Sequence, residues 1–165
     1  MERSQGFPPV ARADARSLIL GSLPGARSIV EQQYYAHPQN AFWRIMRELF
    51  GIEGDYETRC AQLSANGIAL WDVLHSSIRP GSMDADIQVG SAAVNDFAAF
   101  FSRYSDIRTI AFNGKKAEQL FMRFVEPEVK IVGVRRVALP STSPAYASMP
   151  FSGKLKLWRD ALVYE

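Results

Sequence analysis

The chain has 165 residues, 47% of them hydrophobic, which suits the core of one domain but leaves too little chain for two of ordinary size. Lys and Arg outnumber Asp and Glu by 19 to 17, so the net charge neither requires nor excludes a nucleic-acid partner. No apolar run is long enough to span a membrane, the N-terminus lacks the apolar segment of a signal peptide, and the lone Cys60 can form no internal disulfide. We therefore expect one domain over residues 1–165, in a reducing cytoplasm. With only Cys60, His37 and His75 available, neither an iron–sulfur cluster nor an ordinary zinc site is expected, and no cofactor is expected either.

The first structural signal is a strand that runs into a tight turn. Residues 1–16 are expected to form an N-terminal arm, and Ser17–Gly21 has the pattern of a buried strand. The turn contains Pro24-Gly25, and Ser28 and Glu31 have the spacing of a capping box, which predicts a helix start. In an open α/β sheet, the backbone N–H groups of such a turn lie where a ligand binds.

Helix and strand patterns alternate through the rest of the chain. From Phe42 to Phe50 the apolar residues fall on one helix face, and Gly51 is a fitting helix end. Further helices are expected over 55–66, 94–104, 117–124 and 155–164, with strands over 67–73, 107–112 and 130–139, the last broken at Gly133. Segment 75–90 lacks periodicity and is expected to be a long loop of the kind that often carries function. The alternation predicts an α/β fold, a three-layer α/β/α sandwich around a central, mainly parallel four-stranded sheet with right-handed crossovers.

Polar side chains follow three of the predicted strands. Ser22 comes after the first, Asp72 lies at the end of the second and Asn113 follows the third. Because the carboxyl ends of parallel strands meet at one edge of a sheet, we expect these side chains to gather there. For Asp72 a capping or turn-stabilising role is an open alternative, and for Asn113, which precedes a glycine, a plain turn is one.

Two motifs resemble those of a known enzyme family. Gly21-Ser22-Leu23-Pro24-Gly25 is followed by Tyr35, His37-Pro38-Gln39-Asn40 and Phe42-Trp43. This stretch resembles the first motif of the uracil-DNA glycosylase superfamily, most closely the hypoxanthine-DNA glycosylases and the mismatch-specific uracil/thymine glycosylases. Leu139-Pro140-Ser141-Thr142-Ser143-Pro144-Ala145 lies where the superfamily carries its short DNA-inserting loop. The resemblance implies a base-excision repair enzyme that extrudes a deaminated base from DNA and hydrolyses its glycosidic bond.

The sequence departs from the family pattern at one catalytic position. Uracil-removing members carry Asn or Asp third in the Gly-x-x-Pro loop, where this chain has Leu23, which cannot orient water. Asn40 is the nearest amide, and the resemblance to the hypoxanthine-DNA glycosylases implies that it takes this role by accepting a hydrogen bond from the attacking water. The alternative is that Asn40 only caps the helix starting at Ala41, and both roles are compatible.

The resemblance also implies a base pocket. Tyr35 is the candidate face on which the extruded base stacks, against the alternative of an ordinary half-buried tyrosine. Ser22, Leu23 and Phe42 are placed in the same pocket by the motif. Hypoxanthine and uracil share an O=C–N–H edge, which a main-chain N–H and one side-chain acceptor, Asp72 or Asn113, could read.

A second group of residues is assigned to the DNA backbone. Ser141, Thr142 and Ser143 could bind phosphates, with Arg27, Lys115 and Lys116 adding positive charge and Gly25 a backbone N–H, although paired lysines often just form a solvated face. Tyr146, or the Pro144-Ala145 tip, would fill the gap left by the extruded base.

The leading hypothesis is a monomeric, monofunctional glycosylase that releases hypoxanthine from DNA. No lysine in the first motif could form a Schiff base, so lyase activity is not expected. The alternatives are a uracil or mismatch glycosylase that tolerates Leu23, and a damaged-DNA-binding module without catalysis. A nucleoside hydrolase is disfavoured because no carboxylate cluster or metal site is visible.

Overall fold

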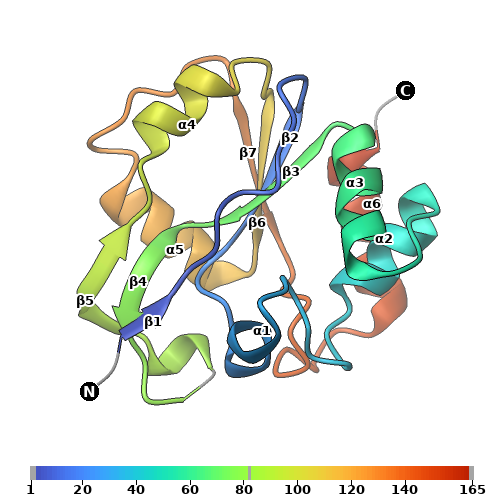
Figure 1. The fold of residues 1–165 in the computed structure, drawn as a ribbon, viewed down its shortest axis with the longest axis horizontal. Coiled ribbons are helices and arrows are strands. Elements are labelled where there is room, and N and C mark those ends of the chain that lie inside the picture. The colour runs from blue at the N-terminus through green and yellow to red at the C-terminus, as the bar shows by residue number, and fades with distance from the viewer. Residues whose placement is uncertain (1–2, 82, 164–165) are drawn as a thin grey trace.

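The protein is organised around a four-stranded parallel sheet, seen near the centre of Figure 1. The computed structural model describes residues 3–81 and 83–163. The strand order is β3-β2-β6-β7, with all neighbours parallel. The strands are β2 (Ser17–Gly21), β3 (Ile68–Asp72), β6 (Thr109–Asn113) and β7 (Arg135–Leu139). Every residue of β2, β3 and β6 is buried, as expected for strands covered on both faces.

Helices cover the two faces of this sheet, which confirms the predicted sandwich (Figure 1). One face carries α2 (Phe42–Phe50), α3 (Tyr56–Ala65) and α6 (Phe151–Leu162), and the other carries α4 (Phe97–Arg103) and α5 (Lys115–Phe124). Phe42 and Trp158 are fully buried in the first layer, and Phe97 and Phe121 are buried in the second. None of the described helices combines the length and apolar character needed to cross a membrane.

Strands of a small antiparallel sheet occupy both ends of the segment expected to be a loop over 75–90, so that expectation was wrong for these ends. Its order is β1-β4-β5, with β1 (Arg3–Gln5), β4 (Leu74–Ile78) and β5 (Gln88–Val94), and a short 3₁₀ helix, η1 (Asp84–Asp86), lies between the last two strands. The β4–β5 register shifts at two places, and buried Ser76 and Ser77 stand where apolar residues would reveal a strand. The N-terminal arm supplies β1, and the main chains of Val10 and Leu70 are hydrogen-bonded.

Two predicted helix starts also differ from the structure. Helix α1 (Ala26–Glu31) begins after Gly25, without a side-chain cap. Ser28 lies inside this helix and its hydroxyl accepts a hydrogen bond from the Ala36 N–H, so the predicted capping box does not form. Helix α4 begins at Phe97 rather than Val94, because Asp96 caps it and Val94 belongs to β5.

The C-terminal helix α6 begins a turn before its predicted start at Leu155. Its last predicted residue, Tyr164, lies outside the described residues.

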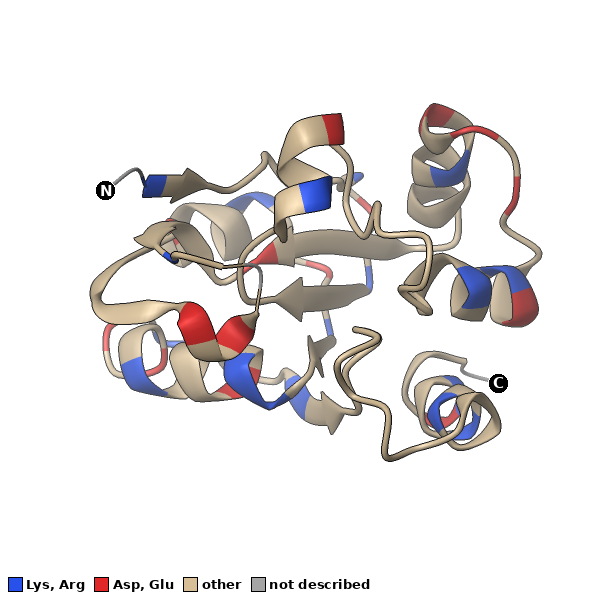
Figure 2. Cartoon of the chain, turned by 90° about the horizontal axis from the view of Figure 1, so that it is seen from below, with Lys and Arg blue, Asp and Glu red and all other residues tan. Residues whose placement is uncertain are grey.

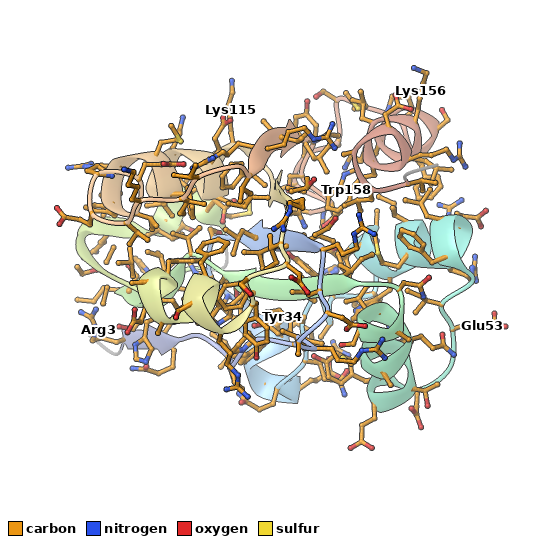
Figure 3. The ribbon with its side chains drawn as sticks, turned by 90° about the horizontal axis from the view of Figure 1, so that it is seen from above. Arg3, Tyr34, Glu53, Lys115, Lys156 and Trp158 are labelled. Carbon is orange, nitrogen blue, oxygen red and sulfur yellow. The ribbon has the colours of Figure 1, made fainter. Side chains whose placement is uncertain are left out.

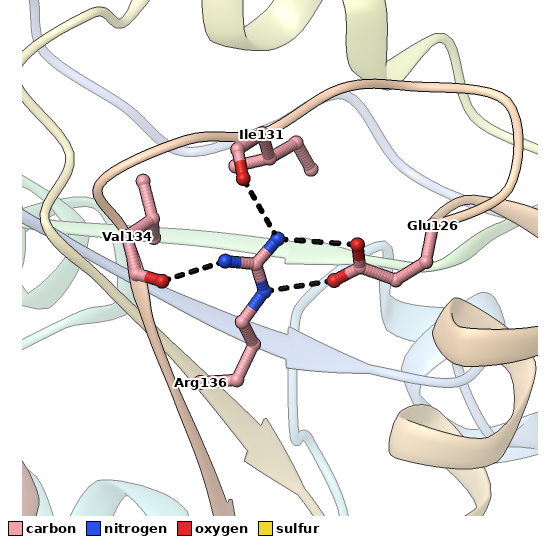
Figure 4. Close-up of polar contacts among 4 residues, drawn as sticks. All are labelled: Glu126, Ile131, Val134 and Arg136. Carbon is pink, nitrogen blue, oxygen red and sulfur yellow. Dashed lines mark hydrogen bonds and ion pairs between the residues drawn. The ribbon is translucent and has the colours of Figure 1, made fainter.

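The connection from α5 to β7 is held by Arg136 (Figure 4). Its guanidinium forms two hydrogen bonds with the Glu126 carboxylate, of 2.7 and 3.1 Å, and donates to the carbonyls of Val134 and Ile131 at 2.6 and 3.1 Å. With Gly133 at φ 74°, this turn delays the strand predicted from residue 130 until Arg135. The turn thereby fixes β7, whose carboxyl end leads into the loop of residues 140–146.

Candidate active site

A cavity of about 690 Å³ lies at the carboxyl edge of the parallel sheet. Figure 2 views the molecule from this edge, where the loops and η1 converge. The cavity brings together most of the residues assigned from sequence: Ser22, Leu23, Gly25, Arg27, Tyr35, Asn40, Asp72, Asn113, Ser141, Thr142, Ser143, Pro144, Ala145 and Tyr146. A separate cavity of about 710 Å³ lies beside β1 and shares none of these residues. The chemistry is therefore sought at the sheet edge.

Tyr35 forms one wall of the cavity. Its backbone adopts the left-handed conformation, with φ 55°, which is uncommon outside glycine and asparagine. The ring stacks on Phe42, with a centroid separation of 4.3 Å and an interplanar angle of 28°. Phe42 is fully buried and does not line the cavity, so it supports Tyr35 from behind rather than meeting a ligand itself.

The side chains of Asp72 and Tyr35 pack closely against Gly21. A methyl group at Gly21 would lie 2.5 Å from Asp72 Oδ1 and 2.9 Å from Tyr35 Oη. Asp72 Oδ2 and Tyr35 Oη are buried and make no hydrogen bond of ordinary geometry within the described part of the chain, although the Asn113 amide lies near the Tyr35 hydroxyl. Buried polar atoms without a partner are costly, so they mark where a ligand's polar atoms would be accommodated.

The same burial changes the protonation of both groups. Burial raises the pKa of Asp72 to about 7, with the nearby Asp84 charge adding to the effect and Arg79 opposing it. Burial, and next the Asp72 charge, raises the pKa of Tyr35 well above its ordinary value. Asp72 thus changes charge near neutral pH while Tyr35 remains a neutral phenol.

Asp84, which lines the cavity, and Arg79, which supports its Leu23-Pro24 turn, are residues that the sequence did not reveal. Arg79 is 7% exposed and donates from its guanidinium to the Leu23 carbonyl at 3.4 Å and to the Pro24 carbonyl. The Ser22 hydroxyl donates to the Asp84 carboxylate. Both residues lie in the segment predicted to be a loop, where no periodicity distinguished a buried charge from an exposed one. Together they hold the Gly21–Gly25 turn against η1.

Asn113 and Thr142 are bonded to each other. The Asn113 amide donates to Thr142 Oγ1 and accepts from the Thr142 N–H, both at 2.9 Å. The Thr142 carbonyl accepts from the Ala41 N–H, and Thr142 is 1% exposed. The Asn113 amide is therefore used within the protein, and the buried Thr142 hydroxyl cannot reach a phosphate. Their role in the structure is to join β6, the 140–146 loop and the start of α2.

Asn40 combines a hydrogen bond at the start of α2 with a place on the cavity wall. Its Oδ1 accepts from the Phe42 N–H at 2.9 Å, and its own N–H donates to the His37 carbonyl. The helix starts at Phe42, one residue later than predicted, so Ala41 and not Asn40 occupies the N-cap position. One lone pair of Oδ1 remains, so the rigidly held amide can still bind a ligand or water. Leu23 is 6% exposed and lines the same cavity.

The 140–146 loop is fixed at both ends by α6. The Trp158 indole N–H donates to the Pro140 carbonyl at 3.0 Å, and Lys154 Nζ donates to the Tyr146 carbonyl at 2.7 Å. Lys154 Nζ also lies 5.2 Å from the centre of the Tyr146 ring, and Lys154 is only 6% exposed. Figure 3 shows Trp158 within the structure and Lys156 pointing outward. A lysine on an amphipathic helix usually indicates a solvated face, so the sequence did not identify Lys154.

Within this loop the serines support turns. Ser141 Oγ accepts from the Ser143 N–H, and Ser143 Oγ accepts from the Ala145 N–H. Residues 144–146 are exposed, and 140–150 carries no charged side chain.

Of the three basic residues assigned to DNA binding, Arg27 lines the cavity and the two lysines lie outside its lining. Lys115 is exposed, points outward in Figure 3, and with Lys116 does not line the cavity. Both lie in the first turn of α5, next to Gly114, where an added methyl would lie 3.1 Å from Ser141 Cβ. Arg27 lines the cavity and is paired with Glu31 at 2.6 Å. Among residues 3–81 and 83–163, no group of His, Cys, Asp or Glu is arranged to hold a metal ion.

The fold and cavity define an α/β protein with a cavity at the carboxyl edge of its parallel sheet. The sequence pattern of the Uracil DNA glycosylase superfamily matches residues 8–162, and the chain belongs to that family.

Two relatives come from species of Methanosarcina. The chain is 38% identical to a protein described as hypoxanthine DNA glycosylase from Methanosarcina acetivorans, over 144 residues that cover 86% of this chain and 87% of the relative. A protein of the same description from Methanosarcina barkeri is 36% identical over 146 residues, 87% of this chain and 88% of the relative. The fold resembles a solution NMR structure of a candidate uracil DNA glycosylase from M. acetivorans, with TM-score 0.79, 33% identity and 94% coverage of both chains.

Gly21→Ala tests the packing at the base of the cavity. The added methyl would meet the Asp72 carboxylate and the Tyr35 hydroxyl, so both side chains must move. We expect glycosylase activity to fall by about two orders of magnitude, as when positioned active-site groups are displaced. Gly90→Ala is the control, because a methyl there meets no atom within 4 Å. Single-turnover rates should separate the two variants, and a fully active Gly21→Ala protein would contradict this geometry.

Proposed function

We propose that this chain is a monofunctional DNA glycosylase that hydrolyses the glycosidic bond of deoxyinosine, releasing hypoxanthine and leaving an abasic site. The observation that carries the proposal is that Leu23 and Asn40 line the same cavity, in a chain 38% identical to a protein described as hypoxanthine DNA glycosylase. Leu23 stands at the loop position where uracil-removing members have a catalytic Asn or Asp. Asn40 supplies an amide to the same cavity from a different position in the chain. The enzyme acts as a single-domain monomer in the cytoplasm, without a metal ion.

The cavity suits an extruded base. The base stacks on the Tyr35 ring, which Phe42 holds in place. Of the three polar side chains at strand ends, Ser22 and Asn113 are bonded within the protein, whereas Asp72 keeps an unpartnered oxygen. Asp72 is therefore the side chain best able to meet a polar atom of the base.

Asn40 orients the attacking water toward C1′ of the sugar. It has no useful acid–base chemistry, so its contribution is to position the water. The hydrogen bond that its Oδ1 accepts from the Phe42 N–H supports this role, because it fixes the direction of the amide.

The outer residues bind the DNA backbone around the cavity mouth. Ser141 and Ser143 offer loop hydroxyls, Gly25 a backbone N–H, and Arg27, Lys115 and Lys116 positive charge. The exposed tip, Pro144-Ala145 or Tyr146, fills the space left by the base.

Lys154→Met should weaken action on duplex DNA more than on single strands. Lys154 holds the Tyr146 carbonyl and ring, so its loss frees the loop that replaces the extruded base. We expect the rate on duplex to fall about tenfold, the size of one lost charge-assisted hydrogen bond, with little change on single strands, where no stacked gap needs filling. Lys156→Met is the matched control, since Lys156 is exposed on the same helix. Equal losses on both substrates would argue against a role for this loop in base extrusion.

The proposal is tested with labelled duplexes carrying one inosine, uracil, xanthine or mismatched thymine, followed by alkaline cleavage at abasic sites. Inosine-containing strands should be cut in the presence of a metal chelator. Dependence on a divalent ion, or binding without cleavage of any substrate, would contradict the proposal.

A further inference from the structure

Asp72 is a buried carboxyl group that takes no part in the water attack directed by Asn40, and its contact with the base can be assigned a chemical role. It ends β3, is 3% exposed and lines the cavity. The Asn95 amide holds its main-chain carbonyl at 2.8 Å, and its strand register pairs it with Gly21. Its Oδ2 has no hydrogen-bond partner within the described residues. The main chain of Asp72 is thus held in place, and its carboxyl group lies at the cavity with one oxygen that no described residue satisfies.

We propose that Asp72 is the general acid of the reaction, donating its proton to N7 of the departing hypoxanthine. This inference rests on the proposed function and adds a catalytic residue to it. A purine is a poor leaving group as an anion, and protonation of its imidazole ring lets it depart neutral. A buried carboxylic acid beside the leaving group is the arrangement such chemistry requires.

The step balances with the groups present. The Asp72 O–H bond breaks and an N7–H bond forms, while the electrons of the C1′–N9 bond move onto the purine. Water adds at C1′ through its oxygen and loses one proton, which restores the acid form of Asp72. The products are neutral hypoxanthine and the abasic sugar, and no other reactant is needed.

The charges around Asp72 suit an acid that works near neutrality. Asp84 of η1 and Arg79, which follows β4, are the charged side chains that act on the Asp72 carboxyl group, and Asp86 acts on Arg79. Tyr34 and Tyr35 are the titratable neighbours whose pKa values rise through burial first and then through the Asp72 charge. Burial, with Asp84 adding to it and Arg79 opposing it, raises the pKa of Asp72 to about 7. His37 is another titratable group of the cavity wall.

The test compares pH profiles of single-turnover hypoxanthine release. The wild-type rate should fall about tenfold for each pH unit above about 7, as the acid form is lost. Asp72→Asn should be slower by about a hundredfold or more and lose this descending limb, whereas His37→Gln should keep it. Asp84→Asn removes a charge that raises the Asp72 pKa. The descending limb of the pH–rate profile of this variant should therefore lie at lower pH than that of the wild type.

A substrate change gives a second readout that does not depend on any variant. In 7-deaza-deoxyinosine a C–H group replaces N7, and the wild-type enzyme should release this base about a hundredfold more slowly than hypoxanthine. Equal rates on both substrates, or a folded Asp72→Asn variant with the wild-type rate and pH limb, would overturn the inference alone. Absence of hypoxanthine release by the wild-type protein at every pH would overturn the proposed function and this inference together.

Discussion

Replacing Asn40 by alanine should reduce hypoxanthine release by about two orders of magnitude or more, a loss typical of removing one positioned polar group. The reason is that the apolar side chain of Leu23 cannot hold water, so Asn40 is the amide of the cavity lining that we assign to this role. Single-turnover rates on an inosine duplex measure this loss directly.

The control for this variant separates catalysis from folding. Asn40 Oδ1 also accepts from the Phe42 N–H, so alanine should lower stability by about 1 kcal/mol. Asn40→Asp keeps an acceptor for both the backbone and the water, and should remain folded with much more activity than alanine. A folded Asn40→Ala protein with normal turnover would show that Asn40 only caps α2.

The contribution of Asp72 to the free energy of unfolding should fall as the pH rises from about 4 to about 7, by about 1.4 kcal/mol for each unit by which its pKa is raised. The Asp72 pKa is raised from 3.8 to about 7, so in this range the folded protein keeps a proton that the unfolded chain has released. Above this range Asp72 is ionised in both states and the destabilisation remains. Thermal unfolding across this range measures the effect.

Asp72→Asn is the matching variant, because it keeps the shape of the side chain without the charge. It should unfold at a higher temperature than the wild type at alkaline pH and show less pH dependence. Exposed Asp14 and Asp55 act in the opposite sense, since hydrogen bonds lower their pKa values and their contribution is lost on acidification. Identical wild-type and Asp72→Asn profiles would show that burial of this carboxyl group carries no cost.

The parallel sheet was predictable because its central strands are buried on both faces and read as continuous apolar runs. Strand β4 was not, because its buried serines and shifted register break the alternation on which strand prediction depends. The lesson for the site is similar. Residues within the Gly21 to Trp43 motif carry local signals, whereas Arg79 and Lys154 are distinguished only by burial that the fold imposes.

The Asn113–Thr142 pair shows that local sequence patterns also fail to predict contacts between distant residues. Each residue, taken alone, has a free polar group suited to a base or a phosphate. Their mutual hydrogen bonds join residues 29 positions apart, and no pattern in the sequence indicates that contact.

The most direct test of the proposed activity is to quantify the free base released from a duplex that contains a single inosine, next to a matched duplex that contains uracil. We expect one hypoxanthine for each abasic site formed, in the presence of chelator, and far slower release of uracil. Faster release of uracil than of hypoxanthine, or tight binding with no free base, would contradict the assignment.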